Sequence, residues 1–137
     1  MVLGAKVELL SKSEQEDFLE LAKYSMSING QEKKEEENIF LSYKYECQLV
    51  DYKITKQDKI DTIILNFNNS TKKIKKIVLI ELLGIFHADG EVCEKETNFL
   101  LNLSNSFNIE VYELNRIKRW VEAMNDIVQE GYELISK

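Results

Sequence analysis

The sequence predicts an all-α protein, a single compact bundle of six to seven helices that contains two pseudo-symmetric helical hairpins. Three observations carry this prediction. The 137 residues include no proline, so the strongest helix breaker is absent. Apolar residues recur at spacings of three and four, the period of a buried helix face. Two segments about sixty residues apart match one another, which indicates an internal duplication.

The N-terminal part is predicted to contain the first helix. The chain has the length of one domain, 1–137, with residues 1–12 as an N-terminal extension for which helix and irregular structure are both open. Ser13 and Glu16 have the spacing of a helix N-cap. The helix that follows ends at Asn29-Gly30, because glycine tolerates the left-handed conformation that stops a helix. Its inward-facing residues are Phe18, Leu21, Ala22, Ser25 and Met26.

The middle of the chain continues the helical pattern. Residues 42–46, S-Y-K-Y-E, alternate as a strand would, but they lie inside a longer helical pattern, so we expect a helix there. Thr55 and Asp58 form a second cap pattern, followed by a stripe of Ile60, Ile63, Ile64 and Phe67. Residues 66–71, N-F-N-N-S-T, are the clearest loop, and they lead into Lys72.

Two further helices are expected in the second half. One carries Val78, Leu79, Leu82, Ile85 and Phe86 and ends at Asp89-Gly90. After residues 106–108, a stripe predicts a long C-terminal helix, for which Gly131 is a candidate break. The stripe consists of Val111, Leu114, Ile117, Val121, Met124 and Val128.

The duplication relates the two glycine stops. Each copy reads as an apolar helix, then Asn or Asp followed by glycine, a five-residue interval, and a glutamate at the start of the next helix. Asn29 corresponds to Asp89 and Glu36 corresponds to Glu96. Each copy is therefore predicted to be a helical hairpin.

Charge and composition narrow the partners. The formal net charge is −6, so most of the surface offers nothing to a phosphate backbone and we expect no nucleic acid partner. The N-terminus lacks the uncharged run of a signal peptide, and the most apolar run, 77–86, is too short to cross a bilayer and contains Glu81. We therefore expect a cytoplasmic protein without membrane insertion, with Cys47 and Cys93 reduced.

The paired hairpins, with A-D-G-E-V-C-E-K-E in the second copy, resemble the TerB-like domains of tellurite resistance proteins. The resemblance runs from about Glu16 to Leu134. It implies a compact all-helical domain without catalytic activity, found with bacterial stress-response proteins and at the head of some membrane-anchored co-chaperones. It also implies an acidic cluster that binds a divalent metal ion. The positions that match are Asp89 and Glu96 in the second hairpin and Glu36 in the first, with Asn29 where the family usually has aspartate.

These four residues form the predicted metal site. Ca²⁺ or Mg²⁺ needs several converging oxygen ligands, and Asn29, Glu36, Asp89 and Glu96 would meet between the two hairpins. An EF-hand is rejected, since Ile85 stands where its first ligand belongs. The alternative is structural: Cys93 and Glu96 have the spacing of a capping box, with Val92 as a hydrophobic staple. Both interpretations stay open, because a cap can also bind metal.

Other candidate residues are weaker. Zinc would need His87 and Cys93, but the matching positions in the first copy are Ser27 and Lys33, so we expect no zinc. Glu81 is expected in a salt bridge or at an edge. The lysines at 72, 73, 75 and 76 are either solvated surface or a patch for an anionic partner. The aromatic residues are expected in the core and its rim, with an exposed subset available to a partner: Tyr24, Tyr43, Tyr45, Tyr52, Tyr112, Trp120 and Tyr132.

The sequence therefore favours a non-enzymatic interaction module of a bacterial stress-response or envelope-associated system. We expect it to dock protein partners, with a divalent ion at the acidic site fixing their geometry. Two alternatives stay open. One is a metal-dependent hydrolase that uses Asp89, Glu96 and Glu36. The other is a purely structural domain with no metal.

Overall fold

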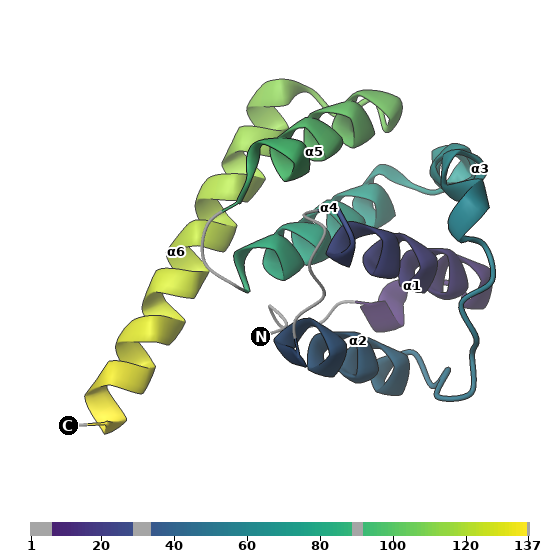
Figure 1. Ribbon diagram of the computed structural model, residues 1–137. Helices are drawn as coiled ribbons and strands as arrows, with labels where there is room; N and C mark the ends of the chain where they lie inside the picture. The colour runs from purple at the N-terminus through teal and green to yellow at the C-terminus, as the bar shows by residue number, and fades with distance from the viewer. Residues whose placement is uncertain (1–6, 29–33, 89–91, 137) are drawn as a thin grey trace.

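The computed structural model describes residues 7–28, 34–88 and 92–136, and about 80% of these residues are helical with no strand among them (Figure 1). The all-α bundle is confirmed. The described residues form six α-helices and three short 3-10 helices. In chain order these are η1 (Val7–Leu9), α1 (Lys12–Met26), α2 (Lys34–Glu46), η2 (Gln57–Lys59), α3 (Ile60–Asn66), η3 (Phe67–Asn69), α4 (Lys72–His87), α5 (Glu94–Ser106) and α6 (Val111–Ile135).

The first helix begins earlier than its predicted cap. Ser11 is the N-cap residue: its Oγ accepts the Glu14 N–H at 3.2 Å, and Glu14 Oε1 accepts the Ser11 N–H at 2.8 Å. This capping box lies two residues before the predicted pair of Ser13 and Glu16, so that prediction was wrong. The cap can sit there because the preceding residues are held in the core, where Val7 and Leu10 are buried.

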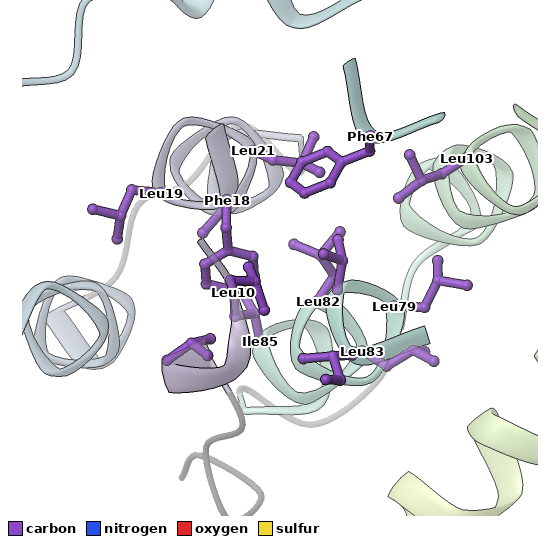
Figure 2. Packing of buried hydrophobic residues seen from close by; sticks show 14 of the residues in the cluster. Leu10, Phe18, Leu19, Leu21, Phe67, Leu79, Leu82, Leu83, Ile85 and Leu103 are labelled. Carbon is purple, nitrogen blue, oxygen red and sulfur yellow. The ribbon is translucent and has the colours of Figure 1, made fainter. Parts of the chain in front are cut away.

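The core lies between α1 and α4, which pack directly against each other. Both predicted apolar faces are buried as expected. Figure 2 shows Phe18 and Leu21 of α1 turned toward Leu82 of α4, with Phe67 and Leu103 beside them. The ring of Phe18 meets Tyr43 of α2 edge to face, with ring centroids 5.0 Å apart. Side chains from η1 and from α1 to α6 therefore share one apolar core.

The second predicted helix cap, in the segment between α2 and α3, was wrong. Thr55 and Asp58 do not cap a helix; Lys56 and Lys59 precede η2 and α3, without side-chain cap hydrogen bonds. The Thr55 N–H donates instead to the buried carboxylate of Glu20 at 3.0 Å, and the Lys56 N–H does the same at 3.0 Å. Tertiary contact with α1 therefore fixes this segment where local capping was predicted.

The remaining predictions for the middle of the chain hold in part. The stripe after η2 is confirmed, since Ile60, Ile63 and Phe67 are buried. Residues 42–46 are helical, within α2. The predicted loop at 66–71 is shorter than expected, because η3 occupies its centre and Thr71 already caps α4 by accepting the Ile74 N–H at 3.3 Å.

The last helix is continuous and extends beyond the bundle (Figure 1). α6 passes through Gly131 without a break, so the predicted break was wrong. A single glycine costs a helix only about 1 kcal/mol relative to alanine. The first half of α6 packs on α4 and α5 through Leu114 and Val121, which are buried. The predicted stripe continues to Val128, but the residues of α6 after Met124 do not belong to the core.

The apolar run in α4 is a buried core helix. Eleven residues of α4 are buried, as a central helix requires. In the described part of the chain, no helix combines the length and the hydropathy that crossing a membrane requires.

Candidate functional site

The two predicted hairpins correspond to α1 with α2 and to α4 with α5 (Figure 1). α1 ends at Met26 and α4 ends at His87, just before the paired glycine motifs. Asn29 and Asp89, two of the four predicted metal ligands, lie outside the described residues, as do Gly30 and Gly90. The structure therefore describes only Glu36 and Glu96 of the predicted site.

Glu96 makes the hydrogen bond expected of a cap. It is the third residue of α5, and its Oε1 accepts the N–H of Cys93 at 2.9 Å. Its side chain is buried, with 4% exposed, and Val92, the residue before the cap, packs against the core. One carboxylate oxygen of Glu96 is thus engaged in holding the start of α5.

Glu36 occupies the equivalent place in the first hairpin. It is the third residue of α2 and is also 4% exposed, so the duplication extends to burial. α2 packs on α1, whereas α5 packs on α3, α4 and α6. Among the residues that the structure describes, no three of the His, Cys, Asp and Glu side chains are grouped closely enough to hold a metal ion. Glu36 and Glu96 would therefore need Asn29 and Asp89 to complete the predicted site.

The single histidine and Cys93 flank the turn of the second hairpin, whereas Cys47 follows the far end of α2. His87 is the last residue of α4, and its Nε2 lies 3.9 Å from Glu122 Oε1 of α6. Burial, followed by the charge of Glu46, raises the pKa of Cys47 to about 11, so this thiol is protonated and unreactive at neutral pH. Cys93 precedes α5 at the N-cap position and is partly buried.

The four lysines at the start of α4 do not form one exposed patch. Lys72 and Lys76 share Glu113 of α6, with Nζ to Oε1 distances of 2.9 and 3.5 Å. The hydrogen bond from Lys72 is the main reason why the pKa of Glu113 lies below its ordinary value. Lys75 is buried, and its Nζ lies 3.5 Å from the carbonyl oxygen of Phe107. Two of these lysines therefore help to fasten α6 to α4.

Glu81 is buried inside the bundle and not at an edge. The hydroxyl of Tyr43 donates to Glu81 Oε2 at 2.8 Å. Burial, followed by the neighbouring carboxylate charge, raises the pKa of Tyr43 well above its ordinary value, which keeps the hydroxyl protonated as a donor. This contact joins α2 to α4 and is structural.

The most exposed apolar surface lies on α6, for which the sequence pattern predicts a core stripe. Trp120, Ile127 and Leu134 are 49%, 61% and 80% exposed. They recur every seven residues, so they form one row along the helix. Tyr112, Tyr132 and Ile135 on the same helix are exposed as well. The seven-residue spacing was visible in the sequence, next to the core stripe.

Beside this row lies a hollow of about 320 Å³ between α4 and α6. Ile80, Ile117 and Trp120 supply its apolar wall, and Lys76, Glu113 and Arg116 supply its polar rim. An apolar wall with a charged rim is suited to an inserted aliphatic side chain.

The fold and this surface define an all-α helical domain with an exposed amphipathic helix. Comparison of the chain with family models, with curated proteins and with solved structures finds no match.

Proposed function

We propose that this chain is a non-enzymatic protein-interaction domain and that α6 is its docking helix. The main support for this proposal is the row of Trp120, Ile127 and Leu134, whose apolar side chains face solvent along one side of α6. Large exposed apolar rows rimmed by charged residues are typical of protein interfaces. Tryptophan and tyrosine are also the residue types that contribute most to such interfaces.

The energetics support docking. Fully burying one isoleucine or leucine side chain is worth about 1.5–3 kcal/mol. The end of α6 beyond Met124 contributes no residue to the core cluster, and Val128 is its one partly buried large apolar side chain. A short helical end with little tertiary packing is marginally stable in water. A partner that covers the row would bury its apolar side chains and would also stabilise the end of the helix.

The proposed setting is a bacterial stress-response or envelope-associated system, in the cytoplasm. The support is the resemblance of the paired hairpins to the TerB-like domains of tellurite resistance. The rival function, a hydrolase that uses Asp89, Glu96 and Glu36, receives less support. Glu36 and Glu96 are each 4% exposed, and a catalytic carboxylate has to reach its substrate.

Docking is tested by the native size of the chain in an extract of the cells that produce it. The wild-type chain should migrate in an assembly larger than its own 16.0 kDa. Replacing Ile127 and Leu134 together by glutamate should release the 16.0 kDa monomer, because the charges cannot be buried in the interface. Native gel filtration measures both sizes.

The matched control replaces Leu41 by glutamate, since this residue is half exposed on α2 and far along the chain from α6. It should leave the assembly intact. A wild-type chain that migrates as a monomer, or an assembly that the α6 changes leave unaltered, would contradict the docking function.

A divalent ion at the hairpins is the second part of the proposal. The support for this ion is that Glu36 and Glu96 occupy equivalent positions in the two hairpins and are equally buried. A bound Ca²⁺ or Mg²⁺ would tie the two hairpins together through oxygen ligands. Since Asn29 stands where an aspartate would add charge, we expect weak binding, roughly 10⁻⁴ to 10⁻³ M.

Calorimetric titration with Ca²⁺ tests this site. Binding should be lost in Asp89→Ala and Glu96→Ala and should tighten in Asn29→Asp. If the carboxylate of Glu96 serves only as a cap, Glu96→Ala instead lowers the stability of the fold by about 0.5–2 kcal/mol. This loss should then be the same in the presence of chelator and in the presence of excess calcium. The absence of both heat and a calcium-dependent shift in melting temperature at several millimolar ion would refute metal binding.

A further inference from the structure

The geometry of α6 points to a second copy of this chain as the docking partner. We propose that two copies pair through antiparallel α6 helices about a twofold axis near Ala123. This inference rests on the proposed docking function and names the partner. The pairing face consists of exposed residues on one side of α6, which are spaced three or four apart except for the adjacent pair of Arg119 and Trp120. They are Tyr112, Arg116, Arg119, Trp120, Ala123, Ile127, Glu130 and Leu134.

The apolar residues of this face are self-complementary. In an antiparallel pair with a twofold axis near Ala123, a residue that precedes Ala123 in one copy lies beside a residue of the other copy that follows Ala123 by about the same number of positions. Tyr112 and Leu134 are equally distant from Ala123, and Trp120 and Ile127 are nearly so. Apolar side chains therefore meet apolar side chains. Ala123 at the centre is small enough to let the two helices approach closely.

The charges of the face are complementary under the same operation. Arg116 and Glu130 lie seven residues before and after Ala123, so each arginine of one copy meets a glutamate of the other. Arg119 is similarly placed toward Asp126. A parallel pairing in register would place like charges opposite each other, which is strongly unfavourable at an interface. The net charge of −6 on each copy opposes random association, so this local pattern selects the antiparallel orientation.

The hollow between α4 and α6 is placed to receive part of the second copy. Trp120 forms one of its walls, and Ile127 of the other copy is the residue that the twofold axis brings next to Trp120. The volume of about 320 Å³ is ample for an isoleucine side chain between Ile80 and Ile117. Two such insertions are expected, one on each side of the axis.

Sedimentation equilibrium of the purified full chain tests the pairing. Between about 1 and 200 μM, a range that covers micromolar dissociation constants, the wild type should form a dimer of twice its 16.0 kDa. Arg116→Glu should weaken the dimer by about tenfold or more, and Glu130→Arg should do the same, because each change places like charges opposite twice. The double variant Arg116→Glu with Glu130→Arg should restore the affinity to within about threefold of the wild type.

Lys118→Glu is the control, since Lys118 lies on the same helix but about 150° away from the pairing face. It should change the affinity less than about threefold. A purified wild-type chain that stays monomeric overturns the inference, and so does a dimer that both charge reversals leave unchanged or that the double variant does not restore.

The native size of the chain in cell extract distinguishes a failure of the pairing inference from a failure of the docking function. A purified monomer that enters an α6-dependent assembly in the extract means that a different chain covers α6. The pairing is then wrong and the docking function stands. A monomer under both conditions overturns both.

Discussion

Replacing Glu20 by alanine is expected to destabilise the fold by about 3 kcal/mol. Glu20 is fully buried on α1, and its carboxylate receives four donors from the segment between α2 and α3. They are the Tyr52 hydroxyl, the N–H groups of Thr55 and Lys56, and the Gln57 side-chain amide. Removing the acceptor leaves these partly buried groups unsatisfied. Urea unfolding measures the loss.

The same carboxylate makes stability depend on pH. Burial alone would raise the pKa of Glu20, but the hydrogen bonds from Tyr52, Thr55, Gln57 and Lys56 outweigh it and lower the pKa below the ordinary 4.5. A lowered pKa in the folded state stabilises the fold above pH 4.5, and this contribution is lost as the pH falls through the folded value. The stability gap between wild type and Glu20→Gln should therefore narrow below pH 4.5.

Glu16→Gln on the same helix serves as the control for this experiment, since Glu16 is only partly buried. Its stability should follow the wild type across the acid range. A gap between wild type and Glu20→Gln that widens toward low pH would contradict the role assigned to the Glu20 carboxylate.

Replacing Phe18 by alanine is expected to cost about 3–5 kcal/mol. Phe18 is fully buried in the core beside α4 (Figure 2), and its ring packs against Tyr43 of α2. The change leaves a cavity in the centre of the core. Since domains are stable by only about 5–15 kcal/mol, much of the total should be lost. Thermal and urea unfolding both measure the effect.

Leu41→Ala provides the comparison, because Leu41 is half exposed on α2. It should change the stability by less than about 0.5 kcal/mol. Comparable losses in the two variants would mean that Phe18 is not at the centre of the core.

Hydrophobic periodicity predicted the core of this fold well. The stripes of α1, α3 and α4 are buried where the spacing placed them, because a buried helix face leaves a direct trace in the sequence. Helix boundaries were predicted less well. Ser11 and not Ser13 is the cap of α1, because η1 holds the chain just before it. Thr55 does not cap a helix, because its N–H donates to Glu20, 35 residues away in sequence. Such tertiary contacts have no local signature.

The candidate sites were predictable to different extents. The spacing of Cys93 and Glu96 predicted the cap that the hydrogen bond between them forms. The burial of Lys75 beneath Phe107 could not be foreseen, since it depends on how α4 and α5 pack. The exposed row on α6 was predicted only in part. Trp120 was among the aromatic residues of which an exposed subset was expected to be available to a partner, whereas Ile127 and Leu134 were missed because they flank a true core stripe. Only the packing shows which of the two rows the bundle covers.

Site-specific photocrosslinking tests the docking function most directly. A photoreactive amino acid replaces Ile127 on α6 or, as the control, Tyr45 on α2, which is 70% exposed. After illumination of the cells that produce the chain, position 127 should form a covalent adduct larger than the 16.0 kDa chain, while position 45 should form none. An adduct of twice the chain mass is expected for pairing with a second copy, and an adduct of another mass would support docking but contradict that pairing. No adduct at position 127, or equal adducts at both positions, would contradict the proposal that α6 is the docking surface.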